Sequence, residues 1–213
     1  MKIRKNEILV FVLVLVTFVA AFLIYPSLPN KIASHWGIDN EVNGYMGKFW
    51  GVFLLPIMMF GFAILFMVIP RIDPKRQNIE KFEKYFDNFV LGFMFFFMYI
   101  YALTIFWNLG YRFILIQFMA PAFAVLFYLI GTMIKYAEPN WSIGIRTPWT
   151  LSNEDVWYKT HKLGGKLFQI VAAVSLLGMI LPQYAIYFVV VPIILVAIYL
   201  VVYSYLEFRK KTT

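Results

Sequence analysis

The residues that could do chemistry in this chain gather between Asn140 and Gly165, a polar segment that lies between strongly apolar ones. Glu154 and His161 could act as an acid–base pair, and Arg146 could hold an anionic group. The chain has no Cys, and the segment offers no convincing Ser nucleophile and no metal-binding set. Three interpretations stay open: a catalytic site, a binding surface, or a structural segment in which Arg146 pairs with Glu154. In the structural interpretation, three Trp side chains lie at the membrane interface: Trp141, Trp149 and Trp157.

The sequence around these residues predicts a turn followed by a helix. Pro148 disfavours helical angles at Thr147, so residues 144–149 are expected to be extended or to turn. Ser152, with Asp155 three residues later, has the spacing of an N-cap with a capping box. Ser152 is therefore predicted to be the N-cap of this helix.

Helical spacing sorts the side chains of this helix into stripes. Glu154, Trp157 and His161 share one stripe, because residues three, four and seven apart recur on one face. A neighbouring stripe that could pair ionically holds Asp155, Lys159 and Lys162. Gly164 and Gly165 would permit close contact with another helix, or a bend.

The composition places this segment in a membrane protein. The chain has 213 residues, of which 62% are hydrophobic and 14% charged, and its mean hydropathy is +0.75. A helix needs about 20 apolar residues to cross a hydrocarbon core of about 30 Å. The runs that qualify are Ile8–Tyr25, Phe49–Ile69, Phe89–Trp107, Phe113–Ile134, Leu167–Leu181 and Tyr184–Leu206. We therefore predict an all-α polytopic membrane protein whose six transmembrane helices form three antiparallel hairpins.

The distribution of basic residues predicts the orientation. With the N-terminus in the cytoplasm, the cytoplasmic pieces hold 16 of the 19 Lys and Arg residues and the outer pieces hold 3. Both termini and the segment 140–165 are therefore expected in the cytoplasm. The net charge of +8 reflects this topology, and no direct nucleic-acid partner is expected.

Two units are expected along the chain. Residues 1–88 form a two-helix membrane unit with an outer loop at 26–48 and a cytoplasmic connection at 70–88. Residues 89–213 form a four-helix domain that carries the cytoplasmic segment 140–165. In the connection, a pattern of Ile79, Phe82 and Phe86 between charges predicts an amphipathic helix on the inner leaflet, or else a partner-binding helix.

The outer loop reads as compact, because it holds two Pro residues and an Asn-Gly turn. His35 and Trp36, near Asp39 and Glu41, could form a recognition surface or a weak metal site, although one His and two carboxylates are not a specific ligand set. Trp36 could instead anchor the loop at the lipid headgroups together with Tyr45.

Each returning helix also carries a Pro some eight residues from its outer end: Pro56, Pro121 and Pro192. A Pro there kinks a helix. The three positions could mark a repeated hairpin or a cavity open to the outside, or Pro could simply be tolerated in membrane helices.

Two groups of residues resemble the SdpI family of bacterial membrane proteins, which confer immunity to a secreted killing peptide. The signature positions that match are Asn140, Gly144, Arg146, Thr147, Pro148, Trp149, Glu154, Trp157, His161 and Gly164. The outer loop is similar to the family's small N-terminal domain at Pro26, Pro29, His35, Trp36, Gly44 and Tyr45. The resemblance implies that the first set binds a partner inside the cell and the second recognises one outside.

The resemblance further implies an immunity protein in the cell membrane, with membrane lipid around it, a secreted toxin peptide as its outer partner and a cytoplasmic repressor as its inner partner. It implies neither catalysis nor a cofactor or metal. Two alternatives are a small-solute permease and a membrane enzyme that uses Glu154 and His161. Ion-coupled transporters usually place ionisable groups inside the bilayer, and the apolar runs carry none in their middle.

Overall fold

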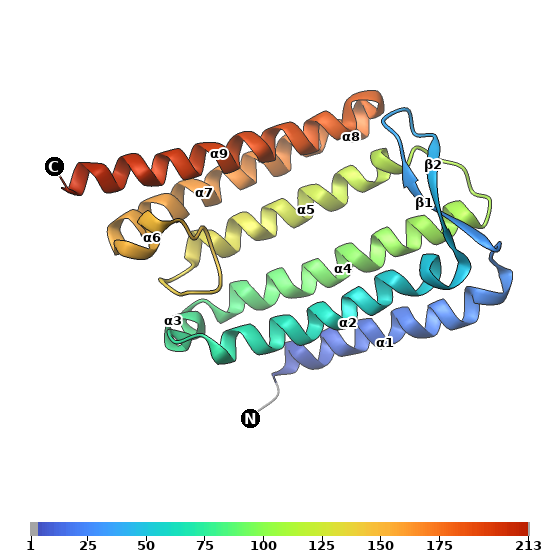
Figure 1. Ribbon diagram of the computed structural model, residues 1–213, viewed down its shortest axis with the longest axis horizontal. Coiled ribbons are helices and arrows are strands. Elements are labelled where there is room, and N and C mark those ends of the chain that lie inside the picture. The colour runs from blue at the N-terminus through green and yellow to red at the C-terminus, as the bar shows by residue number, and fades with distance from the viewer. Residues whose placement is uncertain (1–3, 213) are drawn as a thin grey trace.

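The computed structural model describes residues 4–212, and six of its helices are long and apolar enough to cross a membrane (Figure 1). They are α1 (Lys5–Ile24), α2 (Lys48–Ile72), α4 (Glu83–Asn108), α5 (Leu115–Tyr136), α7 (Glu154–Ser175) and α9 (Ala185–Thr212). Large apolar side chains cover their outer surface; Leu15, for example, is 62% exposed and Leu195 is 61% exposed. Such surfaces suit lipid. The predicted multi-pass helical membrane protein is confirmed.

Short elements connect the six helices: β1 (Lys31–Trp36), β2 (Val42–Gly47), α3 (Arg76–Lys81), α6 (Pro148–Ser152), α8 (Leu177–Ile180) and the 3-10 turns Tyr25–Ser27 and Pro182–Tyr184. The start of α1, the end of α9, α3 and α6 lie at one end of the bundle, and β1, β2 and α8 lie at the other (Figure 1). We call these the terminal end and the hairpin end.

The helices pack in two groups of three. One group holds α1, α2 and α4, the other holds α5, α7 and α9, and the contact between α4 and α5 joins them. The most extensive contact is between α5 and α7. Gly131 and Gly165 make it possible, because a Cβ on either would lie 2.8 Å from the other's carbonyl oxygen. The predicted close helix contact at Gly165 is therefore confirmed. The predicted unit boundary at residues 88 and 89 falls within α4 and stays a prediction.

The outer loop contains an antiparallel β-hairpin, where the sequence predicted only a compact loop in an all-α chain. Lys31 pairs with Gly47 and Trp36 pairs with Val42, with irregular register in between. The hairpin is fixed from below by Ile32, which is fully buried and lies so close to Gly51 of α2 that a Cβ there would overlap it.

The connection 70–88 is not an amphipathic helix on the leaflet. The helix breaks at Phe82, between α3 and α4. Ile79, Phe82 and Phe86 are 2%, 1% and 2% exposed and belong to the largest core cluster. The periodic pattern correctly marked an apolar face, but protein covers that face instead of lipid.

Candidate functional site

The segment 140–165, which we call the signature segment, follows the end of α5 and folds over the terminal end around the side chain of Asn140, which is 2% exposed. Asn140 Oδ1 accepts the backbone N–H groups of Ser142 at 2.9 Å and Ile143 at 2.6 Å. Its Nδ2 donates to the carbonyl oxygens of Glu138 at 2.8 Å and Ile143 at 2.9 Å. One amide thus holds both sides of the turn, as Asn side chains do in Asx-turns.

Trp157 and His161 form the buried floor of the segment, and each is 1% exposed. Their rings stack at 3.9 Å between centroids. Trp157 Nε1 donates to the carbonyl oxygen of Ala137 at 2.8 Å, which ties α7 to the end of α5. The interpretation that Trp157 lies at the membrane interface is therefore wrong, because this indole is part of the protein core.

Both ring nitrogens of His161 bind the backbone. Nδ1 lies 2.8 Å from the carbonyl oxygen of Trp157, so it must donate. Nε2 accepts the backbone N–H of Ile145 at 2.9 Å, so it carries no proton. These two bonds define a neutral imidazole that fastens the segment to α7.

Gly144 can only be glycine in this arrangement. Its φ of +120° lies in the left-handed region that favours glycine, and a Cβ would overlap Nε2 of His161. Gly164 is also tightly enclosed, since a Cβ there would lie 2.5 Å from Cδ1 of Ile145. Both signature glycines are thus explained by close packing around the same short stretch.

Thr147 and Thr150 fix the start of α6. The Thr147 hydroxyl oxygen accepts the N–H of Thr150 at 3.2 Å and lies 3.0 Å from the Ser204 hydroxyl on α9. Helix α7 begins one residue later than predicted, at Glu154, because Asn153 is its N-cap and accepts the N–H of Val156 at 3.1 Å. The predicted N-cap, Ser152, ends α6 instead.

Asp73, at the end of α2, anchors the segment from the other side. It is 4% exposed, and its Oδ2 accepts the N–H of Trp141 at 3.0 Å and the hydroxyl of Ser142 at 2.5 Å. Asn78 of α3 adds a bond from its Nδ2 to the carbonyl oxygen of Pro139 at 2.7 Å. The sequence analysis did not select Asp73; the signal for it was an Asp-Pro pair four residues after the end of an apolar run.

We call a group of exposed residues of the segment the signature surface: Trp141, Arg146, Pro148, Leu151 and Glu154. Arg146 Nη1 donates to the carbonyl oxygen of Trp141 at 2.8 Å, in place of the suggested ion pair with Glu154. Trp149 is half-buried, and its ring lies 5.2 Å from that of Tyr205.

The predicted stripe of Asp155, Lys159 and Lys162 pairs mainly with α9. Lys159 Nζ lies 2.6 Å from Glu207 Oε2, and Lys211 binds Asp155. These ion pairs fix the end of α9 against the start of α7.

The acid–base hypothesis finds no support in this geometry. Seven residues span about 10 Å along a helix, Glu154 is exposed and His161 is buried. Both ring nitrogens of His161 already hold backbone groups. Within residues 4–212, no group of three or more His, Asp or Glu residues could hold a metal ion.

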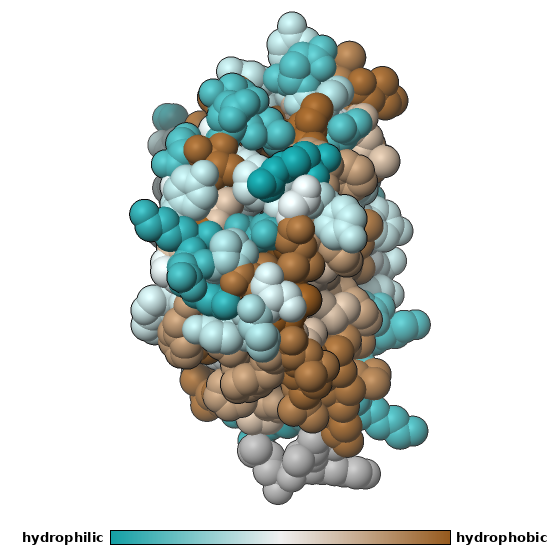
Figure 2. Space-filling model, turned by 90° about the vertical axis from the view of Figure 1, so that its right-hand side faces the viewer, coloured by the Kyte–Doolittle hydropathy of each residue, from teal (hydrophilic) through white to brown (hydrophobic). Residues whose placement is uncertain are grey.

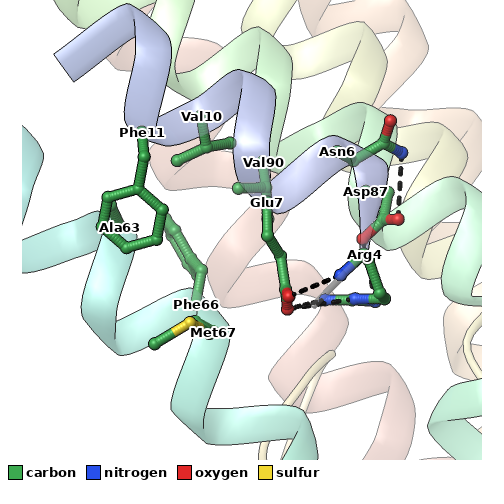
Figure 3. A pocket seen from close by; sticks show the side chains of 10 residues that line it. All are labelled: Arg4, Asn6, Glu7, Val10, Phe11, Ala63, Phe66, Met67, Asp87 and Val90. Atoms are coloured by element: carbon green, nitrogen blue, oxygen red, sulfur yellow. Dashed lines mark hydrogen bonds and ion pairs between the residues drawn. The ribbon is translucent and has the colours of Figure 1, made fainter. Parts of the chain in front are cut away.

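A second charged cluster closes the terminal end of the other helix group (Figure 3). Glu7 of α1 accepts both terminal nitrogens of Arg71, at 2.6 and 2.8 Å. Arg4 lies 2.5 Å from Glu83 and 3.0 Å from Asp87. Burial opposes the charge of Arg4, but the hydrogen bond to Glu83 and the charges of Asp87 and Glu7 outweigh it and raise the pKa of Arg4 above its ordinary value. The hollow beside the cluster has a volume of about 20 Å³, which is room for one water. Because no larger ligand fits there, we assign the charged cluster a structural role.

At the hairpin end, most of the outer-loop residues that resemble the family's small N-terminal domain lie at the surface. Pro26, Pro29, His35 and Tyr45 are exposed, and Trp36 and Gly44 are partly buried. Figure 2 shows this end of the molecule, where hydrophilic side chains gather beside hydrophobic ones. Nδ1 of His35 contacts the side-chain oxygen of Asn43, and Trp36 packs edge-on against Trp107 of α4 with ring centroids 5.4 Å apart.

Comparison with known proteins matches both motif regions. Residues 137–204 match the SdpI/YfhL protein family, and residues 12–60 match a domain of unknown function, DUF1648. The chain is also similar to "Immunity protein SdpI" of Bacillus subtilis (strain 168), with 23% identity over 208 residues that cover 97% of each chain. No solved structure matches. The resemblance predicted from the motifs is confirmed.

Proposed function

We propose that this multi-pass membrane protein, similar along almost its whole length to an immunity protein, protects the cell against a secreted killing peptide. The supporting observation is the extent of that similarity, which covers 97% of both chains. It includes the region that supplies the outer hairpin as well as the region that supplies the signature surface.

The predicted orientation assigns a task to each end. The hairpin end faces outward and meets the peptide, and the terminal end faces the cytoplasm. There, the signature surface is the docking site for a cytoplasmic repressor. Its exposed side chains, such as Trp141 and Arg146, stand on a buried frame that includes Asn140 and His161. A frame held by backbone hydrogen bonds lowers the entropic cost of binding a partner.

The immunity function is tested in the cell that makes this protein. A strain that lacks it is grown together with the parent strain, and viable cells of each are counted as the culture ages. We expect the deleted strain to be lost in mixed culture and to be rescued by the intact gene. Equal survival of the deleted strain at all stages would contradict the proposal.

The docking function needs a separate measurement. A repressor held at the membrane releases its target genes, so transcripts of all genes are counted in cells before and after exposure to spent medium of the parent strain. Substitution of Arg146 or Trp141 by Ala should abolish the response while the protein still inserts. Glu80 is exposed at the same end, so Glu80→Gln serves as the control and should leave the response intact.

A further inference from the structure

A large cavity opens at the hairpin end, between the two groups of helices. Its volume is about 1120 Å³. Trp50 and Leu54 of α2 line one side of the cavity, and Ile116 and Met119 of α5 line another. Ile186 of α9 lines a third side. We call this space the outer crevice.

The crevice opens beside the contact of α4 with α5, which is the main helix–helix contact between the two groups within residues 4–212. The β-hairpin bridges the groups above it. On one side, Asn108 of α4 accepts the backbone N–H of Ala33 at 2.7 Å and donates to its carbonyl oxygen at 3.1 Å. On the other, Asn40 at the hairpin turn accepts the N–H of Leu115 at 2.8 Å, the first residue of α5. The hairpin is thus a roof that is attached to both groups.

The two parts of the lining differ in chemistry. The hairpin supplies polar groups, including His35, Asp39 and Asn43, and the helices supply mainly aliphatic and aromatic side chains. Among the described residues that line the crevice, Asp39 is the only carboxylate, and none is a Lys or Arg. Its carboxylate accepts the N–H of Glu41 at 3.1 Å, and no ion pair joins it to a basic side chain within residues 4–212. Trp36, also in the lining, has a buried indole N–H that finds no acceptor in that range.

We infer that the outer crevice binds an amphipathic peptide with basic residues, whose apolar segment lies against α2 and α5 while a basic side chain approaches Asp39. The inference rests on the proposed function and names the site at which the killing peptide is recognised. Pockets of about 300 to 1000 Å³ hold drug-sized molecules, so this volume suits a peptide segment better than a small solute. A lipid phosphate would meet the unpaired Asp39 carboxylate with repulsion, whereas a basic side chain meets it with attraction.

The inference is tested with the full-length protein in nanodiscs of phosphatidylethanolamine and phosphatidylglycerol. The probe is a synthetic Leu/Lys amphipathic peptide that carries one photoreactive phenylalanine. We expect cross-links to the crevice side chains of α2 and α5. Trp in place of Ile116 fills the space and should raise the dissociation constant at least about tenfold. The matched control, Trp at Val125 on the same helix, lies on a surface that is 59% exposed and should leave it unchanged.

Further variants show whether a loss of binding comes from filling the crevice, from misfolding or from removing the charge of Asp39. Trp in place of Ile186 fills the same space from α9, so a folding failure of the Ile116 variant alone does not decide the result. Asp39→Asn should weaken binding at low salt and have less effect at high salt, because salt screens an exposed charge pair. Glu80→Gln, at the terminal end, is its control.

Several outcomes would overturn the inference: cross-links that map outside the crevice, equal binding by the Ile116 and Val125 variants, or a photoreactive phospholipid that labels the crevice and is not displaced by the peptide.

The immunity function is judged separately, by the co-culture experiment. If the intact protein protects cells and both Trp-filled crevice variants protect equally well, the crevice assignment fails and immunity stands. If the intact protein gives no protection while the probe cross-links in the crevice, immunity fails and the binding site stands.

Discussion

His161 and Ile145 are joined by a buried hydrogen bond, in which the backbone N–H of Ile145 donates to Nε2 of the imidazole at 2.9 Å. The other ring nitrogen binds the carbonyl oxygen of Trp157. This histidine therefore works as a clamp between α7 and the signature segment, and the residue most suggestive of catalysis becomes part of the frame.

Replacing His161 by Leu should destabilise the protein, because the N–H of Ile145 would be left buried without an acceptor. We expect a loss of about 1 to 3 kcal/mol in the free energy of unfolding. Unfolding in mixed detergent micelles measures it. His35→Leu is the matched control, since the chain has two His residues and His35 is exposed. Equal stability of the two variants would show that the clamp contributes nothing.

Ala in place of Gly144 should also lower stability, for two reasons. The backbone there has φ +120°, and the new Cβ would overlap His161. The left-handed conformation alone costs about 1 to 2 kcal/mol for a residue with a Cβ, so we expect a larger loss than that. Gly61→Ala provides the comparison, because a Cβ at Gly61 meets nothing within 4 Å. The assignment is contradicted if the thermal stability of both variants matches that of the parent.

Asp73→Ala should release the signature segment from the end of α2. Trp141 and Ser142 would lose an acceptor, and hydrogen bonds to charged groups contribute about 1.5 to 3 kcal/mol each. Trypsin should then cleave faster after Arg146, as followed by mass spectrometry. Asp73→Asn keeps an acceptor oxygen and should give an intermediate rate. An unchanged rate in the Ala variant would mean that the segment is held by other contacts.

Asn108→Leu should loosen the β-hairpin, because Asn108 satisfies both the N–H and the carbonyl oxygen of Ala33. Amide hydrogen exchange in β1 reports the change directly, and we expect faster exchange at Ala33 and its neighbours. Asn88→Leu introduces the same change at an exposed position of the same helix. Exchange rates in β1 that do not differ between these two variants would remove Asn108 from its role.

The sequence could predict the spans because length and hydropathy decide them. Six apolar runs became six long helices, and the connection between α4 and α5 is short, as an antiparallel hairpin requires. It also predicted the extended backbone at Thr147, which has φ −97° and ψ 161°, but it placed Pro148 and Trp149 in the same extended or turning stretch, and both lie in α6. The N-cap was misplaced by one residue because Ser152 and Asn153 are both good caps, and packing of the preceding short helix selects between them.

Contacts between distant segments could not be predicted. Helical periodicity places Trp157 and His161 on one face, but it does not show that the segment 137–145 folds back and buries them. Asp73 reaches Ser142 across 69 positions of sequence, and no local pattern encodes such a pair. The three Pro residues did raise the idea of a cavity open to the outside. Of these, Pro56 follows directly after Leu55, which lines the outer crevice.

The proposed division of labour requires the hairpin and the signature surface to face opposite sides of the membrane. The chain has no Cys, so single cysteines can be introduced at Tyr45, which is 61% exposed, and at Trp141, which is 51% exposed. A membrane-impermeant maleimide added to intact cells should label the Tyr45→Cys variant and leave the Trp141→Cys variant unlabelled until the membrane is permeabilised. Labelling of Trp141→Cys in intact cells would contradict the account.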